Sequence, residues 1–95
     1  MGLADNAKAR GQISLTNTQK NEQAAITIRR ALGRSVRIQR QILKNIKGIV
    51  AAAPGNKAAI LDLLGADKDE AVSMINNMRA FVNTHKMSGD EDINV

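Results

Sequence analysis

The chain has 95 residues, enough for one domain, and carries a net charge of +5 from 14 Lys and Arg against 9 Asp and Glu. It contains no cysteine, which excludes a disulfide framework and a thiolate metal site. Phe81 is the one aromatic residue, so we expect a thin aliphatic core whose stability depends on partners or on self-association.

The first 16 residues are small and polar, with Gly2 and Gly11 and no sustained period. Ile13 and Leu15 alternate with polar neighbours, a pattern typical of a short extended segment. We therefore expect residues 1–16 to form a flexible or extended N-terminal arm.

Residues 17–53 carry the pattern of one long amphipathic helix, which Asn17 or Thr18 would cap. On a helical wheel the apolar and basic side chains occupy opposite arcs, with Ile26 as an apolar exception. The apolar arc supplies the candidate core or self-association residues, which are Ile28, Leu32, Val36, Ile42, Leu43, Ile46, Ile49 and Val50. The basic arc supplies the candidate residues for binding an anionic partner, which are Arg29, Arg30, Arg34, Arg37, Arg40, Lys44 and Lys47.

The length of this predicted helix conflicts with the size of the domain. A helix over residues 17–53 would be ~55 Å long, whereas a domain of this size has a diameter of roughly 30 Å. The helix must therefore project or break, and its weak points are Gly33 with Ser35, and Gly48. A projecting helix would leave part of the apolar arc uncovered, so we expect another chain to cover it.

Pro54 and the glycine after it end the long helix. A short second helix is predicted at residues 57–64, which carry four Ile and Leu residues. We expect Asn56 to cap its start and Gly65 to take the left-handed conformation at its end.

The third helix is predicted at residues 68–86, with Asp67 and Glu70 as a capping pair. Residues 88–95 form an acidic tail that we expect to be disordered. The predicted fold class is therefore all-α, with a long basic helix followed by a helical hairpin in one domain over residues 17–87. We expect this domain to be oligomeric.

Charge is distributed unevenly along the chain. Residues 1–56 carry +8 and residues 57–95 carry −3, and no acidic residue stands between Gln23 and Leu61. Such asymmetry favours a polyanionic partner or head-to-tail association of copies. The acidic run Asp90–Asp92 would either solubilise the tail or mask the basic arc.

Four interpretations of the basic arc remain open: nucleic acid, an acidic protein or a second copy, a solvated face, and a membrane surface. Nucleic-acid binding gains from phosphate neutralisation, but the arc has no aromatic residue for stacking and only Gln41 for reading bases. A membrane surface is disfavoured because no Trp or Phe anchors the helix.

The second and third helices have the length of a helix-turn-helix, with Gly65 in the turn. Leu61 stands where a small residue is usually needed, and the would-be recognition helix opens with the acidic segment Asp67–Glu70. This segment would meet the DNA phosphates with net negative charge, so a plain helical hairpin is the better interpretation.

Catalytic chemistry is hard to build from this composition. The chain has no Cys and no Tyr, a single His, and no glycine-rich phosphate loop. His85 lies on the apolar side of the third helix, where a lone His is more often a packing residue than a metal ligand. We expect no enzymatic activity, cofactor, metal site or small-molecule substrate.

These patterns favour a non-enzymatic structural protein that self-associates through the apolar arc and places its basic arc on an anionic surface. A component of a large assembly, such as a virus particle, fits this description. The alternative is a nucleic-acid-binding accessory or regulatory protein.

Localisation is expected to be cytoplasmic, or within an assembly formed there. The longest apolar run, Ile49–Ala53, is far shorter than a bilayer span. The N-terminal residues lack the apolar region of a secretory signal.

Overall fold

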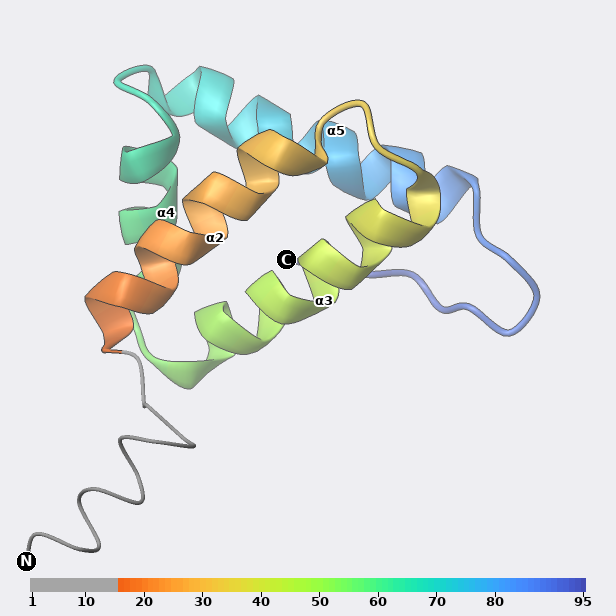
Figure 1. The fold of residues 1–95 in the computed structure, drawn as a ribbon, viewed down its shortest axis with the longest axis horizontal. Helices are drawn as coiled ribbons and strands as arrows, with labels where there is room; N and C mark the ends of the chain where they lie inside the picture. The colour runs from red at the N-terminus through yellow and green to blue at the C-terminus, as the bar shows by residue number, and fades with distance from the viewer. Residues whose placement is uncertain (1–15) are drawn as a thin grey trace, which may run out of the picture.

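The computed structural model describes residues 16–95 and contains four helices in that range (Figure 1). They are α2 (Asn17–Ala31), α3 (Val36–Ala52), α4 (Asn56–Leu64) and α5 (Lys68–Thr84). This part of the chain has no strand, so the predicted all-α class is confirmed. Apart from Thr16, the predicted N-terminal arm lies outside the described residues.

A break between α2 and α3 replaces the single helix predicted over residues 17–53. After α2 ends at Ala31, Gly33 adopts a φ of 81°, in the left-handed region that favours glycine. The Ser35 hydroxyl then caps α3 by accepting a hydrogen bond from the backbone N–H of Ile38 at 3.3 Å. The prediction of one long helix was wrong, and the chain breaks at a weak point that the sequence contains.

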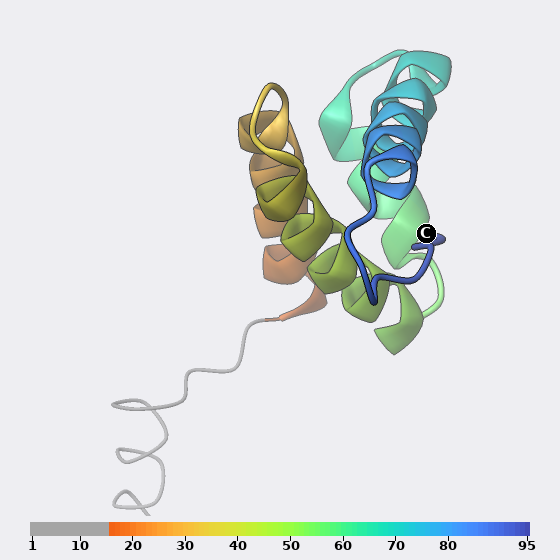
Figure 2. The same ribbon diagram turned by 90° about the vertical axis from the view of Figure 1, so that its right-hand side faces the viewer.

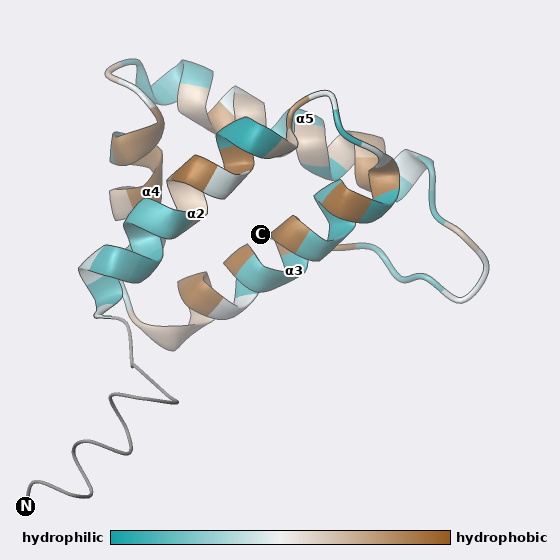
Figure 3. Cartoon of the chain, viewed as in Figure 1, coloured by the Kyte–Doolittle hydropathy of each residue, from teal (hydrophilic) through white to brown (hydrophobic). Residues whose placement is uncertain are grey.

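The break brings both halves of the predicted helix into one small domain. At about 1.5 Å per residue, the 15 residues of α2 span ~22 Å and the 17 residues of α3 span ~26 Å. Helix α3 returns alongside α2 (Figure 1), and apolar and polar residues alternate along both helices (Figure 3).

No described helix combines the length and the apolar content needed to cross a bilayer.

The first described helix begins with a reciprocal cap. The Thr16 hydroxyl accepts a hydrogen bond from the backbone N–H of Gln19 at 3.1 Å, and the Gln19 side chain accepts one from the Thr16 N–H at 3.0 Å. The cap of α2 is therefore Thr16 rather than the predicted Asn17 or Thr18.

Asn56 ties three helices together instead of capping α4, because Gly55 occupies the cap position. Its buried amide donates to the Ile49 carbonyl at 2.8 Å and accepts from the Asn21 amide at 3.2 Å. At the other end of α4, Gly65 has an extended φ of 168°, not the predicted left-handed conformation.

Helix α5 begins at the predicted acidic cap and ends slightly earlier than predicted. The Asp67 carboxylate accepts hydrogen bonds from the backbone N–H groups of Asp69 at 2.9 Å and Glu70 at 3.3 Å. The helix ends at Thr84, where the predicted range continues to residue 86.

The core lies where the four helices meet. Helix α2 packs against α3 and α4, and α5 packs against the same two helices. Seen from the side, α4 and α5 lie together, with α2 and the start of α3 on the other side (Figure 2). Every helix contributes to the largest fully buried side chains, which are Ile28, Leu43, Ile46, Ile60, Met78 and Val82.

The C-terminal segment is folded against the helices, contrary to the disordered tail predicted for residues 88–95. Ile93 is 5% exposed and belongs to the core. The Asn83 side chain donates to the Ile93 carbonyl at 3.1 Å and accepts from the Ile93 N–H at 2.9 Å. Lys86 and Asp92 form an ion pair at 2.7 Å. Two apolar side chains, Ile93 and the partly buried Val95, and these polar contacts anchor a segment whose composition alone predicted disorder.

Candidate functional site

The apolar arc predicted for self-association is mostly occupied by the core of this chain. Three of its eight residues are fully buried, namely Ile28, Leu43 and Ile46. Four more are partly buried and packed against the core, namely Val36, Ile42, Ile49 and Val50. Leu32 differs, because it is 46% exposed in the α2–α3 turn. The arc as a whole is therefore not open to a second chain.

The basic arc stays largely on the surface, but the break divides it. Six of its seven residues are exposed, namely Arg29, Arg30, Arg34, Arg37, Lys44 and Lys47. Because α3 runs back alongside α2, Arg30, Arg34 and Arg37 lie within and beside the turn that joins the two helices, and Arg37 also lines a hollow with Lys44 and Asp90. We call these three residues the arginine turn. Lys44 and Lys47 lie further along α3.

Arg40 is the exception, because its side chain is buried within the chain. Its guanidinium donates to the Val82 carbonyl at 2.9 Å and to the Glu91 carbonyl at 3.0 Å, and its Nε lies 3.3 Å from an Asp90 carboxylate oxygen. Only 8% of the residue is exposed. Arg40 therefore links α3, α5 and the C-terminal segment, and it is not available to an outside anion as the sequence predicted.

Two exposed arginines contact backbone carbonyls at helix ends. Arg29 donates to the Leu63 carbonyl at 2.6 Å, near the end of α4, and Arg34 donates to the Arg30 carbonyl at 3.4 Å, near the end of α2. A cation is favourable there because the helix dipole is negative at its C-terminal end. Within residues 16–95, neither arginine forms an ion pair with a carboxylate.

The acidic run of the C-terminal segment lies beside the α3 part of the basic arc. A hollow of about 300 Å³ is lined by basic residues of α3 and by tail residues, which are Arg40, Lys44, Lys47, Gly89, Asp90, Glu91, Asp92 and Ile93. The hydrogen bond and charge of Lys86, together with the charge of Arg40, lower the pKa of the Asp92 carboxyl. The tail thus brings negative charge to α3.

An apolar cleft adjoins the arginine turn. Its volume is about 370 Å³, and its lining comprises Leu32, Gly33, Arg34, Gln39, Asn77, Met78 and Phe81. Leu32 is 46% exposed, and Phe81, the one aromatic residue of the chain, is 36% exposed. We call this feature the Leu32–Phe81 cleft. It combines a cation with apolar side chains that the core has not covered.

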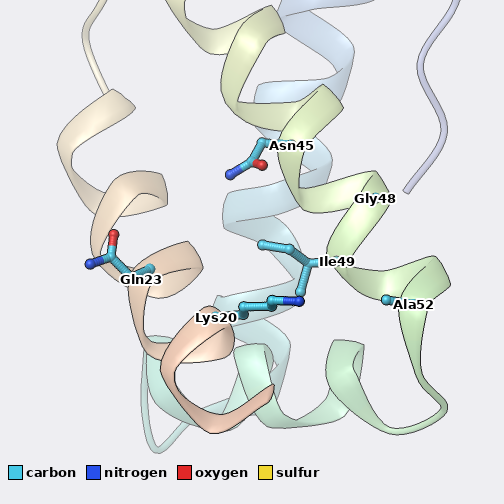
Figure 4. Close-up of a pocket in the computed structure, with 6 residues that line it drawn as sticks. All are labelled: Lys20, Gln23, Asn45, Gly48, Ile49 and Ala52. Atoms are coloured by element: carbon cyan, nitrogen blue, oxygen red, sulfur yellow. The ribbon is translucent and has the colours of Figure 1, made fainter. Parts of the chain in front are cut away.

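A second cleft, of about 360 Å³, separates the start of α2 from the end of α3 (Figure 4). Lys20 and Gln23 line it from α2, with the Lys20 side chain pointing toward Ile49, and the α3 side is formed by Asn45, Gly48, Ile49 and Ala52. Lys20 is the one titratable group of this lining, so the cleft offers no acid–base pair. Among the described residues, no group of three or more His, Asp and Glu side chains is placed to hold a metal ion.

His85 occupies the C-cap position of α5, beyond its last turn. Its Nδ1 lies 2.9 Å from the Phe81 carbonyl oxygen, and the two rings pack at a centroid distance of 4.8 Å. His85 is nevertheless exposed and lies beyond the last helical residue, so it is a boundary residue and not part of the predicted apolar side of the helix.

Two structural features escaped the sequence analysis. One is the internal role of Arg40, for which the helical wheel gave no indication, because at about 100° per residue Arg29 and Lys47 lie closer to the apolar arc and both are exposed. The other is the anchor formed by Asn83 and Ile93, for which the two apolar residues of the acidic tail, Ile93 and Val95, were the available indication.

The fold and surface define a small all-α protein of four described helices with an exposed basic turn. In comparisons with known proteins, the chain matches no family model, no curated protein and no solved structure.

Proposed function

We propose that this chain is a non-enzymatic assembly protein that docks its arginine turn on an acidic protein surface. The observation that supports this function is the position of Arg34, which lines the same cleft as the exposed Leu32 and Phe81. Within the described residues, the three arginines of the turn contact no carboxylate, so their charge is open to a partner.

The mixed character of this surface favours a protein partner over a bare polyanion. Arginine and aromatic side chains are enriched at the centres of protein interfaces, where a cation and an apolar anchor are covered together. Covering the exposed parts of Leu32 and Phe81 would contribute on the order of 1–2 kcal/mol. A phosphate backbone would bind the arginines but would leave the apolar side chains of Leu32 and Phe81 exposed to water.

Docking at the turn replaces the mechanism expected from the sequence. Self-association was predicted to use the whole apolar arc, but the core already covers seven of its eight residues in full or in part. Leu32 is the residue of that arc that a partner can still reach, and it lies beside Arg34 in the cleft.

Binding of fluorescent polyglutamate at low salt tests this function. We expect the chain to bind and the double variant Arg34→Glu with Arg37→Glu to bind at least tenfold more weakly. The matched control is Lys44→Glu with Lys47→Glu, which changes the net charge equally at a place where the tail already supplies acids. Absence of binding at low salt, or an equal loss in both variants, would contradict the proposal.

Nucleic-acid binding remains the second candidate, because Arg30, Arg37, Lys44 and Lys47 are exposed cations without a carboxylate partner in the described structure. Each phosphate neutralised on duplex DNA should add a slope of about −0.9 to a plot of log affinity against log salt. A slope of about −3 or steeper, lost equally in both double variants, would favour this candidate over protein docking.

A further inference from the structure

Within residues 16–95, most acidic residues outside the C-terminal segment lie at the corner between α4 and α5. Four exposed acids gather there, namely Asp62, Asp67, Asp69 and Glu70. The bases beside them are Lys68, which is exposed, and Arg29, whose guanidinium is held on the Leu63 carbonyl. The corner therefore keeps an excess of negative charge, with carboxylates that form no ion pair in the described structure.

The same corner exposes apolar side chains. Leu63 is 40% exposed at the end of α4, and Val72 is 37% exposed in the first turns of α5. Each stands next to the acids in the chain. The corner is thus acidic and partly apolar, whereas the arginine turn is basic and partly apolar. In both charge and apolar content, the two surfaces complement each other.

Within one copy these two surfaces point in different directions. Val72 and Phe81 are nine residues apart on α5, which at about 100° per residue puts them on opposite sides of the helix. Glu70 and Phe81 are separated by roughly 17 Å along the helix axis. Val72 and Phe81 therefore face different sides of α5, and Arg29, which precedes the arginine turn, contacts the Leu63 backbone carbonyl and not a carboxylate, so the charges of both surfaces have no ion-pair partner in the described structure.

We infer that the arginine turn and the Leu32–Phe81 cleft dock on the α4–α5 corner of a second copy of this chain. This inference rests on the proposed function and names its acidic partner. Leu63 of one copy would cover the cleft of the other, while its flanking carboxylates meet the arginines. Pairing like with like would bring three arginines against three arginines, so each contact joins the arginine turn of one copy to the corner of another, which either closes a reciprocal dimer or builds a ring or a filament.

Sedimentation of the full chain at increasing concentration is the first measurement. We expect the mass to rise above that of one chain at low salt and to fall back as salt screens the contact. Two reversal variants are each expected to stay monomeric. They are Arg34→Glu with Arg37→Glu, and Asp62→Lys with Glu70→Lys. Circular dichroism checks that each keeps its helices.

An equimolar mixture of the two reversal variants is the deciding test. Each variant then offers the surface that the other lacks, so we expect the higher mass to return, as it should for one chain that carries all four substitutions. Phe81→Ser should weaken the association, whereas Ile26→Ser, at a comparably exposed residue on α2, should leave it unchanged.

A mass of one chain at every concentration, or a mixture that stays monomeric, would overturn the inference. A mass that rises only when DNA is added would overturn it in favour of nucleic-acid binding. If polyglutamate still binds to the arginine turn of a monomeric chain, the proposed function survives and only the second copy is wrong as its partner.

Discussion

The guanidinium of Arg40, in the middle of α3, lies 3.3 Å from the carboxylate of Asp90 in the C-terminal segment. The same side chain donates to the carbonyls of Val82 and Glu91, so one arginine holds α3, the end of α5 and the tail together. Burial of this cation is tolerable because its charge and its hydrogen-bond donors are answered within the chain.

Replacing this cation should destabilise the fold. We expect Arg40→Gln to lower the free energy of unfolding by about 2–3 kcal/mol, because Asp90 and the carbonyls of Val82 and Glu91 lose their partner. This value lies at or below the lower end of the range of about 3–5 kcal/mol that breaking a fully buried ion pair usually costs, because the Asp90 side chain is 29% exposed. Urea denaturation measures the change. The control is Lys47→Gln, on the exposed face of the same helix, which should change the free energy of unfolding by no more than about 0.5 kcal/mol. If Arg40→Gln and Lys47→Gln destabilise the chain equally, Arg40 is not a structural link.

Ile93 should act as the anchor of the C-terminal segment. We expect Ile93→Ser to cost about 2–4 kcal/mol, because it removes a buried side chain and places a hydroxyl in the core. Hydrogen exchange should also accelerate at the Ile93 amide, which now donates to Asn83. Glu91→Gln, at an exposed position in the same segment, serves as the control. Unchanged exchange in the Ile93 variant would mean that the segment is held by its charges alone.

Two glycines should respond to alanine with opposite signs. Gly33 has a φ of 81° with open space around it, so Gly33→Ala should destabilise by about 1 kcal/mol through backbone strain alone. Gly48 lies inside α3, also with open space, so Gly48→Ala should stabilise by about 0.5–1 kcal/mol. Thermal unfolding of the two variants measures both changes. Stabilisation by both would mean that the helix continues through residue 33.

The ion pair between Asp92 and Lys86 should be visible in an acid titration. The Asp92 pKa is lowered from its ordinary value of 3.8, first by the hydrogen bond and charge of Lys86. The unfolded chain then binds the proton more readily, so the pair contributes stability above pH 3.8 and loses it as pH falls through the folded pKa. Carboxyl chemical shifts in NMR measure this pKa, and Lys86→Gln should return it toward 3.8. A normal pKa in the parent chain would show that the pair does not persist in solution.

Local features could be predicted from the sequence because they depend on neighbouring residues. The helical period, the stop at Pro54 and the cap at Asp67 all follow from backbone preferences and hydrogen bonds within a few positions. The separation of apolar and basic arcs on the wheel also identified Ile28, Leu43 and Ile46, which the structure buries.

The tertiary structure alone decided what those arcs face. A periodic pattern over residues 17–53 is the same for one long helix and for two antiparallel helices joined at Gly33, and burial against α4 and α5 selects the second arrangement. The same packing takes Arg40 out of the basic arc and draws Ile93 into the core. In each case the stabilising contacts are made with residues that are far away in the sequence. Sequence therefore determined that the chain forms two-faced helices with a basic side. Non-local packing decided which parts of these faces stay exposed in the described structure: the arginine turn and the Leu32–Phe81 cleft do, whereas Arg40 and most of the apolar arc do not.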